Sequence, residues 1–192
     1  MEQTRPGPGR PRDPDLDAAI LYAARAQLAT NGYDAMSVVA VAADAGTTRQ
    51  AIYRRWPTKA DLATAAIASL SEAETRQPTD DPFADLVTEL EAFHRGVTRP
   101  NGVSIVGSML QDATDPELQK LYRQRLVEPR RKRLRDVLER GIAAGILDPD
   151  GDLDTAVAAC TGTLYARHLT GRRLPKTWPR DTATFVWRAM GG

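Results

Sequence analysis

The sequence of 192 residues predicts an all-α protein built of consecutive helices. Three observations support this fold class. Apolar residues recur three and four positions apart through most of the chain, which is the period of a helix with one buried face. Glycines, prolines and capping residues divide the chain into segments of helical length. No segment shows the sustained alternation of apolar and polar residues that is typical of a half-buried strand.

The composition is that of an ordinary soluble globular chain, with 42% hydrophobic and 27% charged residues. The formal net charge is only +1, so a nucleic-acid partner would require basic residues concentrated in one place. Cys160 is the only cysteine and there are two histidines, which excludes an intrachain disulfide and a cluster of soft metal ligands. We therefore expect no metal and no cofactor. The chain has no run of about 20 apolar residues and no secretory signal, which favours a cytoplasmic protein without a membrane partner.

The first three helices follow a basic arm at residues 1–14, which is rich in Pro, Gly and Arg and is predicted to be flexible. Asp13 and Pro14 begin the first helix, and Asn31-Gly32 ends it. Ser37 caps a short second helix that stops at Gly46. Thr47 or Thr48 caps a third helix that stops before Pro57.

A fourth helix begins after Thr58 and runs to residue 76, where "QPTDDP" at 77–82 breaks it. The sequence therefore predicts an N-terminal domain at 15–76, including the start of the linking fourth helix, and a C-terminal domain at 77–192. Helical patterns in the second domain cover 83–94, 103–113, 116–144, 152–169 and 178–190. Pro129 is expected to kink or break the long 116–144 segment, and Gly145 to end it.

The stretch "AGTTRQAIYRRW" at 45–56 joins the second and third helices in a helix-turn-helix pattern. Such a unit presents the first residues of its second helix to base edges in the major groove, and these residues are Thr48, Arg49 and Gln50. An arginine can pair bidentately with guanine and a glutamine with adenine. Between Gly46 and Lys59 there are four basic residues and no acidic residue, which is the local concentration that the net charge conceals.

Other residues of the same stretch have a second interpretation. Tyr53, Arg55 and Lys59 are suited to phosphate oxygens, which set the register without specifying sequence. The alternative for Tyr53 is a role in the structure of the domain. Ile52 and Trp56 are expected to pack inside it.

At these residues the chain resembles the TetR family of bacterial transcriptional regulators. The resemblance is carried by Ser37, Val41-Ala42, Ala45-Gly46, "TTRQAIYRRW" at 47–56, Thr58-Lys59 and Leu62. It implies a three-helix DNA-binding domain, linked by a fourth helix to a C-terminal ligand-binding and dimerisation domain. It also implies a homodimer on a palindromic double-stranded DNA operator, usually released by a small-molecule effector. The chain departs from the family in having no acidic residue early in its second helix.

The candidate DNA-binding residues are Ser37, Thr47, Thr48, Arg49, Gln50, Tyr53, Arg55 and Lys59, with Arg10 and Arg12 in the arm. The arm segment "RPGPGRPR" at 5–12 resembles extensions that lie in narrow A·T minor grooves, where arginine is attracted by the negative potential. The alternative is a disordered terminus without a role.

A second basic run, at 123–135, is interpreted as the solvated face of an amphipathic helix. One arginine of this run, Arg125, is predicted to point inward and receive an anionic ligand. The family's domain arrangement places a ligand pocket in this domain, with candidate residues Phe93, Val106, Met109, Leu110, Leu121, Tyr122, Arg125 and Tyr165. The alternative for each apolar residue is ordinary core packing.

The last two helices are expected to form the homodimer as a four-helix bundle with their symmetry mates. Cys160 lies in this region and is interpreted as a small buried residue, although a nearby two-fold axis could bring two copies together. His94 and His168 are expected to lie at the surface or to have hydrogen-bond partners.

The function predicted from the sequence is a ligand-responsive DNA-binding transcriptional regulator, most simply a repressor. An all-helical enzyme or small-molecule-binding protein is the alternative, but no nucleophile–base pair, phosphate loop or metal cluster supports an enzyme. Ser104 and Ser108 lie in a glycine-rich stretch without a matching histidine motif. A helical module that binds an acidic protein partner is a third possibility.

Overall fold

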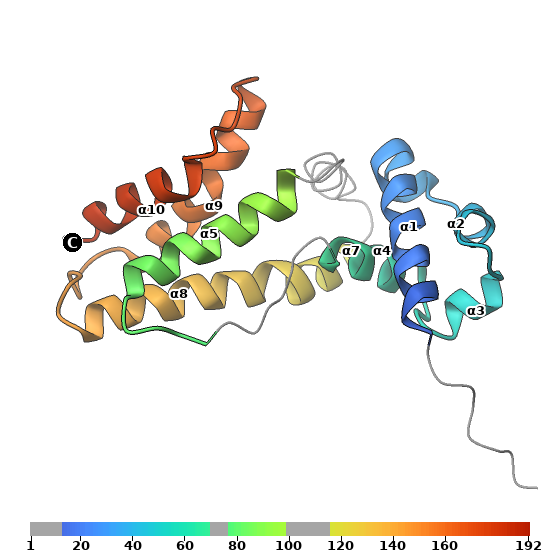
Figure 1. The fold of residues 1–192 in the computed structure, drawn as a ribbon, viewed down its shortest axis with the longest axis horizontal. Helices are drawn as coiled ribbons and strands as arrows, with labels where there is room; N and C mark the ends of the chain where they lie inside the picture. The colour runs from blue at the N-terminus through green and yellow to red at the C-terminus, as the bar shows by residue number, and fades with distance from the viewer. Residues whose placement is uncertain (1–12, 70–76, 99–115) are drawn as a thin grey trace, which may run out of the picture.

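The computed structural model describes residues 13–69, 77–98 and 116–192, and these residues form helices joined by turns (Figure 1). The predicted all-α fold is confirmed. Four helices form one end of the molecule: α1 (Pro14–Ala35), α2 (Val38–Asp44), α3 (Arg49–Tyr53) and α4 (Lys59–Ala68). The other end is built from α5 (Pro82–Thr98), α8 (Glu128–Ala143), α9 (Leu153–Leu169) and α10 (Trp178–Ala189). Between them lie α7 (Pro116–Tyr122) and one π-helical turn, η1 (Arg123–Val127).

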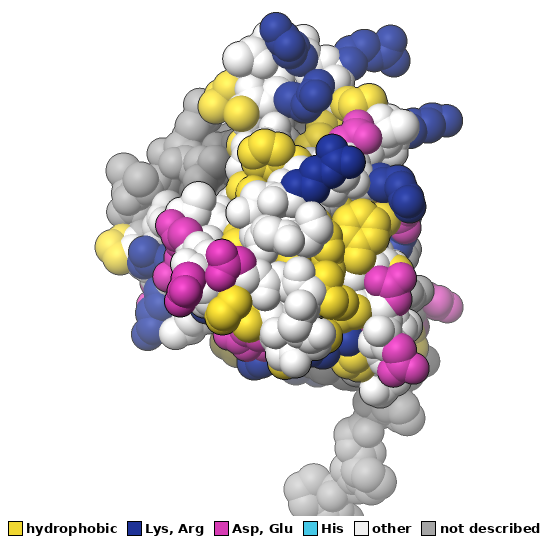
Figure 2. All heavy atoms as spheres, turned by 90° about the vertical axis from the view of Figure 1, so that its left-hand side faces the viewer, with side chains coloured by type: hydrophobic (Ala, Val, Ile, Leu, Met, Phe, Trp, Pro, Cys, Tyr) yellow, Lys and Arg dark blue, Asp and Glu magenta, His cyan; other side chains and the backbone are white. Residues whose placement is uncertain are grey.

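The surface at the α10 end carries basic and acidic side chains with hydrophobic ones between them (Figure 2). Both signs of charge therefore occur at this end, in keeping with the small net charge of the chain. Among the helices that the structure describes, none is long and apolar enough to cross a bilayer.

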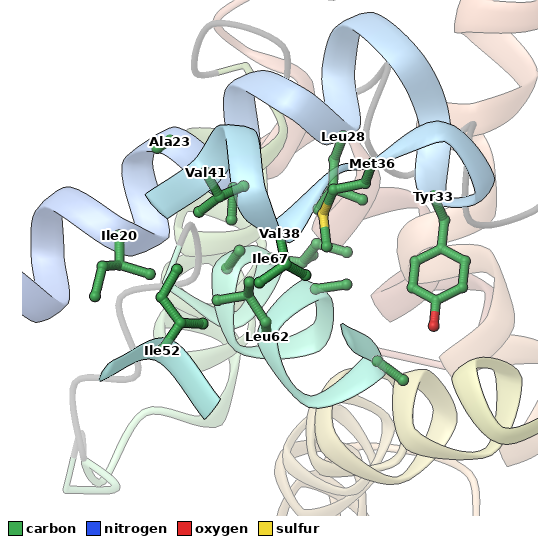
Figure 3. Close-up of a cluster of buried hydrophobic side chains, with 14 of the residues drawn as sticks. Ile20, Ala23, Leu28, Tyr33, Met36, Val38, Val41, Ile52, Leu62 and Ile67 are labelled. Carbon is green, nitrogen blue, oxygen red and sulfur yellow. The ribbon is translucent and has the colours of Figure 1, made fainter. Parts of the chain in front are cut away.

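The N-terminal core is formed by apolar side chains from α1 to α4 that meet in one cluster (Figure 3). Ile20, Ala24 and Leu28 repeat every four residues on α1 and are fully buried, as their spacing predicted. Ile52 of α3 and Leu62 of α4 complete the same cluster and are also fully buried. The prediction that Ile52 packs inside is confirmed, and Trp56 packs against the cluster while partly exposed.

The starts of these helices are set by local hydrogen bonds that the sequence predicted. The Oγ of Ser37 accepts from the backbone N–H of Ala40 at 3.3 Å, and Thr48, rather than Thr47, caps α3. Thr58 forms a capping box with Asp61, whose carboxylate accepts from the Thr58 backbone N–H at 3.1 Å. The first turn of α2 holds no acidic residue. Ser37 therefore caps α2 without the return bond from a side chain to its own backbone N–H that completes a capping box.

The predicted end of α1 at Asn31-Gly32 needs correction. Gly32 does leave helical geometry, with φ 73° and ψ 179°, but the chain returns to a helical turn that ends at Ala35. A glycine tolerates this φ because it has no Cβ. The extra turn allows Tyr33 and Met36 to bury in the N-terminal core, which is a tertiary gain that the local signal does not reveal.

The helix does not break at Pro129, because the π turn η1 leads directly into α8. Proline lacks an N–H and its ring crowds the carbonyl four residues earlier. In η1 the N–H of Glu128 instead bonds the carbonyl of Arg123, five residues back, so the helical path continues into α8. Such turns insert one extra residue without breaking a helix. α8 then ends before Gly145, as predicted.

The C-terminal core lies between α5, α8, α9 and α10 and includes the fully buried Leu86, Leu90 and Leu138. Cys160 is also fully buried there, and burial raises the pKa of its thiol to about 12. It behaves as the small buried residue that was predicted, and its position in the core leaves it unavailable to a second copy.

The segment 116–127 packs with the N-terminal helices, although the sequence pattern placed it within the second domain. Leu118 of α7 and Leu126 of η1 are buried in the N-terminal core beside α4. The buried side chains of α8, which follows directly, belong to the C-terminal core. One nearly continuous helical path therefore contacts both halves of the molecule (Figure 1).

Candidate functional site

The turn between α2 and α3 is built around Gly46, whose φ of 63° lies in the left-handed region. The N–H of Gly46 donates to Ala43 O at 3.1 Å, and the N–H of Thr47 donates to Ala42 O at 2.9 Å. These two bonds form a Schellman motif, which satisfies the last carbonyls of α2 and turns the chain sharply. The turn brings Thr48 to the start of α3 within a few residues, as a helix-turn-helix requires.

The beginning of α3 presents polar side chains to solvent. Thr48, Arg49 and Gln50 are all exposed, whereas Ala51 and Ile52 face the core. The Cζ of Arg49 lies 5.2 Å from the ring centroid of Tyr53, one helical turn later. This cation–π contact holds the guanidinium beside the ring on the exposed side of the helix. Arg49, Gln50 and Tyr53 thus form one surface with the chemistry predicted for DNA contact.

Arg55 and Lys59 are turned towards the protein. The Nε of Arg55 pairs with the carboxylate of Asp17 on α1, its Nη1 donates to Ala51 O at 3.1 Å, and its side chain is only 13% exposed. Lys59 donates to Asp34 O at 2.9 Å, and its Nζ lies 4.6 Å from the ring centroid of Tyr33. Both cations therefore stabilise the domain in this structure, and their phosphate contacts stay predictions.

Ser37 and Thr47, two further candidates for DNA contact, have structural roles in the helix-turn-helix. Ser37 is exposed at the start of α2 with its hydroxyl engaged as a cap, and the half-buried Thr47 contributes the N–H bond of the turn. The arm residues Arg10 and Arg12 lie outside the described residues. The DNA contacts proposed for all of these positions remain predictions.

In the C-terminal domain, Phe93 of α5 lies at the centre of an aromatic group. Its ring centroid is 6.2 Å from that of Tyr165 and 6.0 Å from that of Trp178, both at steep angles. The Cζ of Arg130 lies 4.5 Å from the Phe93 centroid. The structure thus brings together two of the predicted pocket residues and adds an arginine that the sequence analysis had placed on the solvated face.

The remaining pocket candidates are spread more widely. Tyr122 and Leu121 pack against the N-terminal core, and Tyr122 also interacts electrostatically with Tyr165 and Arg130. Burial raises the pKa of Tyr122 to about 12. Val106, Met109 and Leu110 lie outside the described residues, as do Ser104 and Ser108.

Arg125 is placed differently from the prediction. Its Nη2 donates to Asp61 at 2.7 Å and its Nη1 to the Thr64 hydroxyl at 3.2 Å, so it joins η1 to α4. Burial alone would raise the pKa of Asp61, but hydrogen bonds from Thr58 and Arg125, with the charge of Arg125, hold it below its usual value. The arginine that faces the aromatic group is Arg130.

His94 also differs from the expectation of a satisfied or surface histidine. Its ring stacks on Trp178 with a centroid distance of 6.0 Å, and its buried Nε2 has no hydrogen-bond partner among the described residues. Burial, with a smaller contribution from Arg95, lowers the pKa of His94 and favours the neutral ring.

A cavity of about 180 Å³ lies between α5 and α8, on a side of α5 that none of the predicted pocket residues lines. Its charged lining residues are already paired: Arg133 donates to Glu89 at 3.0 Å, and Arg140 pairs with Asp85. Burial would raise the pKa of Asp85, but bonds from Arg140 and Thr79 lower it below its usual value. This paired lining ties α8 to α5. Within the described part of the chain, no three potential metal ligands gather.

Two residues at these places, Asp17 and Arg130, were not predicted to interact as they do. Asp17 lies in the first turn of α1, and nothing local connects it with Arg55, which lies 38 residues away. Arg130 was one of many basic residues in the 123–135 run. The adjacent Pro129 was the available signal, because it marks where helical periodicity changes.

Comparison with known proteins matches both parts of the chain. A family described as bacterial regulatory proteins, tetR family, matches residues 20–66, and the tetracyclin repressor-like C-terminal domain matches residues 76–186. The uncharacterized HTH-type transcriptional regulator YdeS of Bacillus subtilis (strain 168) is 33% identical over 95% of this chain and 93% of YdeS. The HTH-type transcriptional regulator AqdR of Rhodococcus erythropolis is 28% identical over 91% of this chain and 83% of AqdR.

Solved structures share the same architecture. The TetR family transcription regulator SCO0332 is 26% identical, with a TM-score of 0.65 over 91% of this chain and 98% of that protein. The flavonoid-responsive regulator FrrA is 21% identical, with a TM-score of 0.63 over 92% of this chain and 97% of FrrA. With the helix-turn-helix at one end and the matching helical domain at the other, the protein is a member of the TetR family of HTH-type transcriptional regulators.

Proposed function

We propose that this regulator binds a palindromic DNA operator through α3 and is released when a small molecule binds its C-terminal domain, so that it acts as a repressor. The observation that carries the proposal is the exposed Arg49–Gln50 pair at the start of α3, positioned by the turn at Gly46. Residues at this place in a helix-turn-helix reach base edges in the major groove.

The roles of individual residues follow from their placement. Arg49 and Gln50 are the candidates for base contacts, because both are exposed and can make bidentate pairs with guanine and adenine. Tyr53 and Thr48, beside them, supply hydroxyl groups for phosphate oxygens. Arg55 and Lys59 act first by fixing α3 and α4 against α1, since their contacts in this structure are internal.

A homodimer through α9 and α10 is supported by the apolar groups that these helices expose. Leu169 is 85% exposed and Phe185 is 63% exposed. On α9 the exposed positions include Ala158, Gly162 and Ala166, which repeat every four residues, and a Cβ added at Gly162 would meet nothing. Such a small-residue face allows close approach of a second helix pair. A two-fold dimer would place two α3 helices on the two halves of a palindrome.

The proposal is tested by selecting genomic fragments with the purified protein at about 150 mM salt, where non-specific affinity is weak. Recovery of a palindromic site is expected, and the Arg49→Ala and Gln50→Ala variants should lose it. Arg95→Ala is the matched control, because it removes an exposed arginine from the C-terminal domain. Recovery of no specific site by protein that has been freed of small molecules by unfolding and refolding would contradict the proposal.

A further inference from the structure

Four basic residues lie at the end of α9 and in the segment that joins it to α10: Arg167, Arg172, Arg173 and Lys176. We call residues 167–176 the basic connection. The sequence has no acidic residue between Asp154 and Asp181, and all four basic side chains are exposed. Because the whole chain has a net charge of only +1, the basic connection is a local concentration of charge, as the helix-turn-helix is.

The cations of the basic connection differ from those of α8 in their partners. Arg133 of α8 pairs with Glu89, and Arg140 of the same helix pairs with Asp85. Among the described residues, no carboxylate pairs with any of the four cations of the basic connection. Their charge is therefore uncompensated within the protomer and available to an anionic partner.

The end of α9 holds these residues outside the C-terminal core. The N–H of Gly171, whose φ is 68°, donates to His168 O at 3.0 Å, and the N–H of Arg172 donates to Arg167 O at 3.0 Å. These two bonds form a Schellman motif, which ends α9 and turns the chain. Residues 166–173 are all exposed, so the turn presents its side chains to solvent.

The basic connection lies at the end of α9 and α10 that is nearer to the N-terminal helices. Along the long axis of the molecule it lies between the C-terminus and α1–α4 (Figure 1). In Figure 2, Lys and Arg side chains gather at the top of the face, which is the side that the connection occupies in Figure 1. The charge therefore projects from the side of the C-terminal domain where α9 and α10 are joined.

The proposed dimer gives this placement a direction. If α9 and α10 form the dimer contact, they lie beside its two-fold axis, and the same axis passes through the centre of a palindromic operator. Both helix-turn-helix units then lie on the DNA side of the dimer. The end of α9 and α10 that is nearer to α1–α4 faces the centre of the operator, between the two half-sites.

DNA is the anionic partner that this placement favours. A duplex carries one negative charge for about every 1.7 Å of its length, and Lys and Arg bind its phosphates without reading the sequence. A phosphate contact by Arg172 or Arg173 would break no ion pair, in contrast to one by Arg55, which is paired with Asp17. An acidic protein would match the charge as well, but the helix-turn-helix itself brings DNA to this side of the molecule.

We propose that the basic connection is a second DNA-binding surface, which contacts phosphates at the centre of the operator and adds affinity without sequence specificity. The inference rests on the proposed function, which supplies the dimer and the palindromic operator. It assigns part of the DNA affinity to the C-terminal domain.

The test measures DNA affinity by fluorescence anisotropy with the full chain at salt concentrations from about 50 to about 200 mM. The probes are the operator duplex recovered in the DNA selection and a mixed-sequence duplex of the same length. Arg172→Gln combined with Arg173→Gln removes two cations from each protomer. Because each neutralised phosphate contributes about 0.9 to the slope of log affinity against log salt, this slope should become shallower by at least about 2 for both duplexes.

Lys132→Gln combined with Arg188→Gln is the matched control. It changes the net charge by the same amount, but these exposed residues lie on α8 and near the C-terminal end of α10. The control should keep the wild-type slope. Sedimentation equilibrium establishes that each protein is dimeric, and Arg167→Gln combined with Lys176→Gln carries the test if the first pair disturbs the dimer.

A modified operator tests the location of the contact. Methylphosphonate linkages carry no charge, so placing them between the half-sites should weaken binding of the wild type and leave binding of the Arg172→Gln, Arg173→Gln protein unchanged. A wild-type slope in that double variant, an equal change in the control, or equal sensitivity of both proteins to the central methylphosphonates would overturn the inference.

The outcome is separate from that of the DNA selection. An operator recovered by the selection, with equal salt slopes in the wild type and the double variant, would contradict the inference alone and leave the basic connection to an acidic protein partner. A shallower slope on the mixed-sequence duplex, without any operator in the selection, would contradict the repressor proposal and leave the DNA-binding surface in place.

Discussion

Two arginines six positions apart in one basic stretch have different surroundings. Arg49 is exposed, and its guanidinium lies over the ring of Tyr53. Arg55 is paired with Asp17, and the two side chains are only 13% and 24% exposed. A phosphate contact by Arg55 would compete with this ion pair. We therefore expect the loss of the Arg55 side chain to lower the stability of the domain.

We expect Arg55→Ala to lower the free energy of unfolding by about 1–3 kcal/mol, because it leaves a partly buried carboxylate without its hydrogen-bonded partner. Urea denaturation measures the change. Arg54→Ala is the control, since Arg54 is exposed and should change stability by no more than about 0.5 kcal/mol. Unchanged stability in Arg55→Ala with reduced DNA affinity would assign Arg55 to phosphate binding instead.

His94 makes stability depend on pH. Its pKa is lowered from 6.5 in the folded state, chiefly by burial, so the unfolded chain takes up a proton first as the pH falls. The free energy of unfolding should therefore decrease as the pH is lowered through 6.5 towards the folded pKa, and change no further from this cause below it. In His94→Phe, which keeps a flat ring on Trp178, this dependence should be weaker.

The comparison is made by urea denaturation of both proteins at about pH 7.5 and about pH 5.5. Both keep His168, so the difference between them reports His94 alone. Identical pH dependence in the two proteins would show that His94 is not protonated differently on unfolding.

At the scale of elements, the junction between the two halves depends on η1. Arg125 of this turn donates to Asp61 and Thr64 of α4, while α8, which continues from it, packs against α5 and α9. Under the proposed function, this contact is the path by which a movement of α8 on effector binding would reach α4 and, through the N-terminal core, α3.

The strength of this contact is measurable by a double-mutant cycle with Arg125→Met and Asp61→Asn. We expect a coupling energy of about 0.5–1 kcal/mol, because Arg125 is partly exposed and solvent screens the pair. The cycle is needed because Asp61 also forms the capping box with Thr58, which Asp61→Asn disturbs by itself. A coupling energy near zero would remove Arg125 from the path between the domains.

The sequence predicted elements well where the determinants are local. Ser37, Thr48 and Thr58 cap their helices through bonds to backbone groups within three residues, so the local sequence identifies them. The prediction of which side chains face inward failed after the π turn η1. A turn with one extra residue rotates every later side chain around the helix relative to ideal α-helical spacing. The arginine predicted to point inward was Arg125, whereas the one whose guanidinium lies over the Phe93 ring is Arg130, which follows the π turn.

At the scale of the whole molecule, the sequence predicted two helical parts but not which helices meet. An amphipathic pattern shows that a face is buried and does not show what covers it. This explains why Leu118 and Leu126 were placed in the C-terminal domain although they pack with α4. The DNA-facing surface was easier to predict because Arg49, Gln50 and the Gly46 turn lie within five consecutive positions.

The proposed dimer makes a further prediction at this scale. Phe185→Glu should convert the dimer to a monomer, because it introduces a charge into a face that α10 would bury against the second copy. Sedimentation equilibrium measures the oligomeric state. Tyr22→Glu is the control, since Tyr22 is 70% exposed on α1, in the N-terminal part of the molecule, and should leave the dimer intact. A Phe185→Glu protein that remains dimeric would place the interface elsewhere.

The depth of Cys160 has a practical consequence for observing this protein at work. A thiol reacts as its thiolate, and a side chain with no exposed surface and a pKa of about 12 offers neither access nor charge. Since it is the only cysteine, a single exposed cysteine introduced at Ala26 on α1 would be the one position that accepts a spin label or a fluorophore. Distances between two such labels would report how far apart two copies hold their α1 helices, before and after an effector is added.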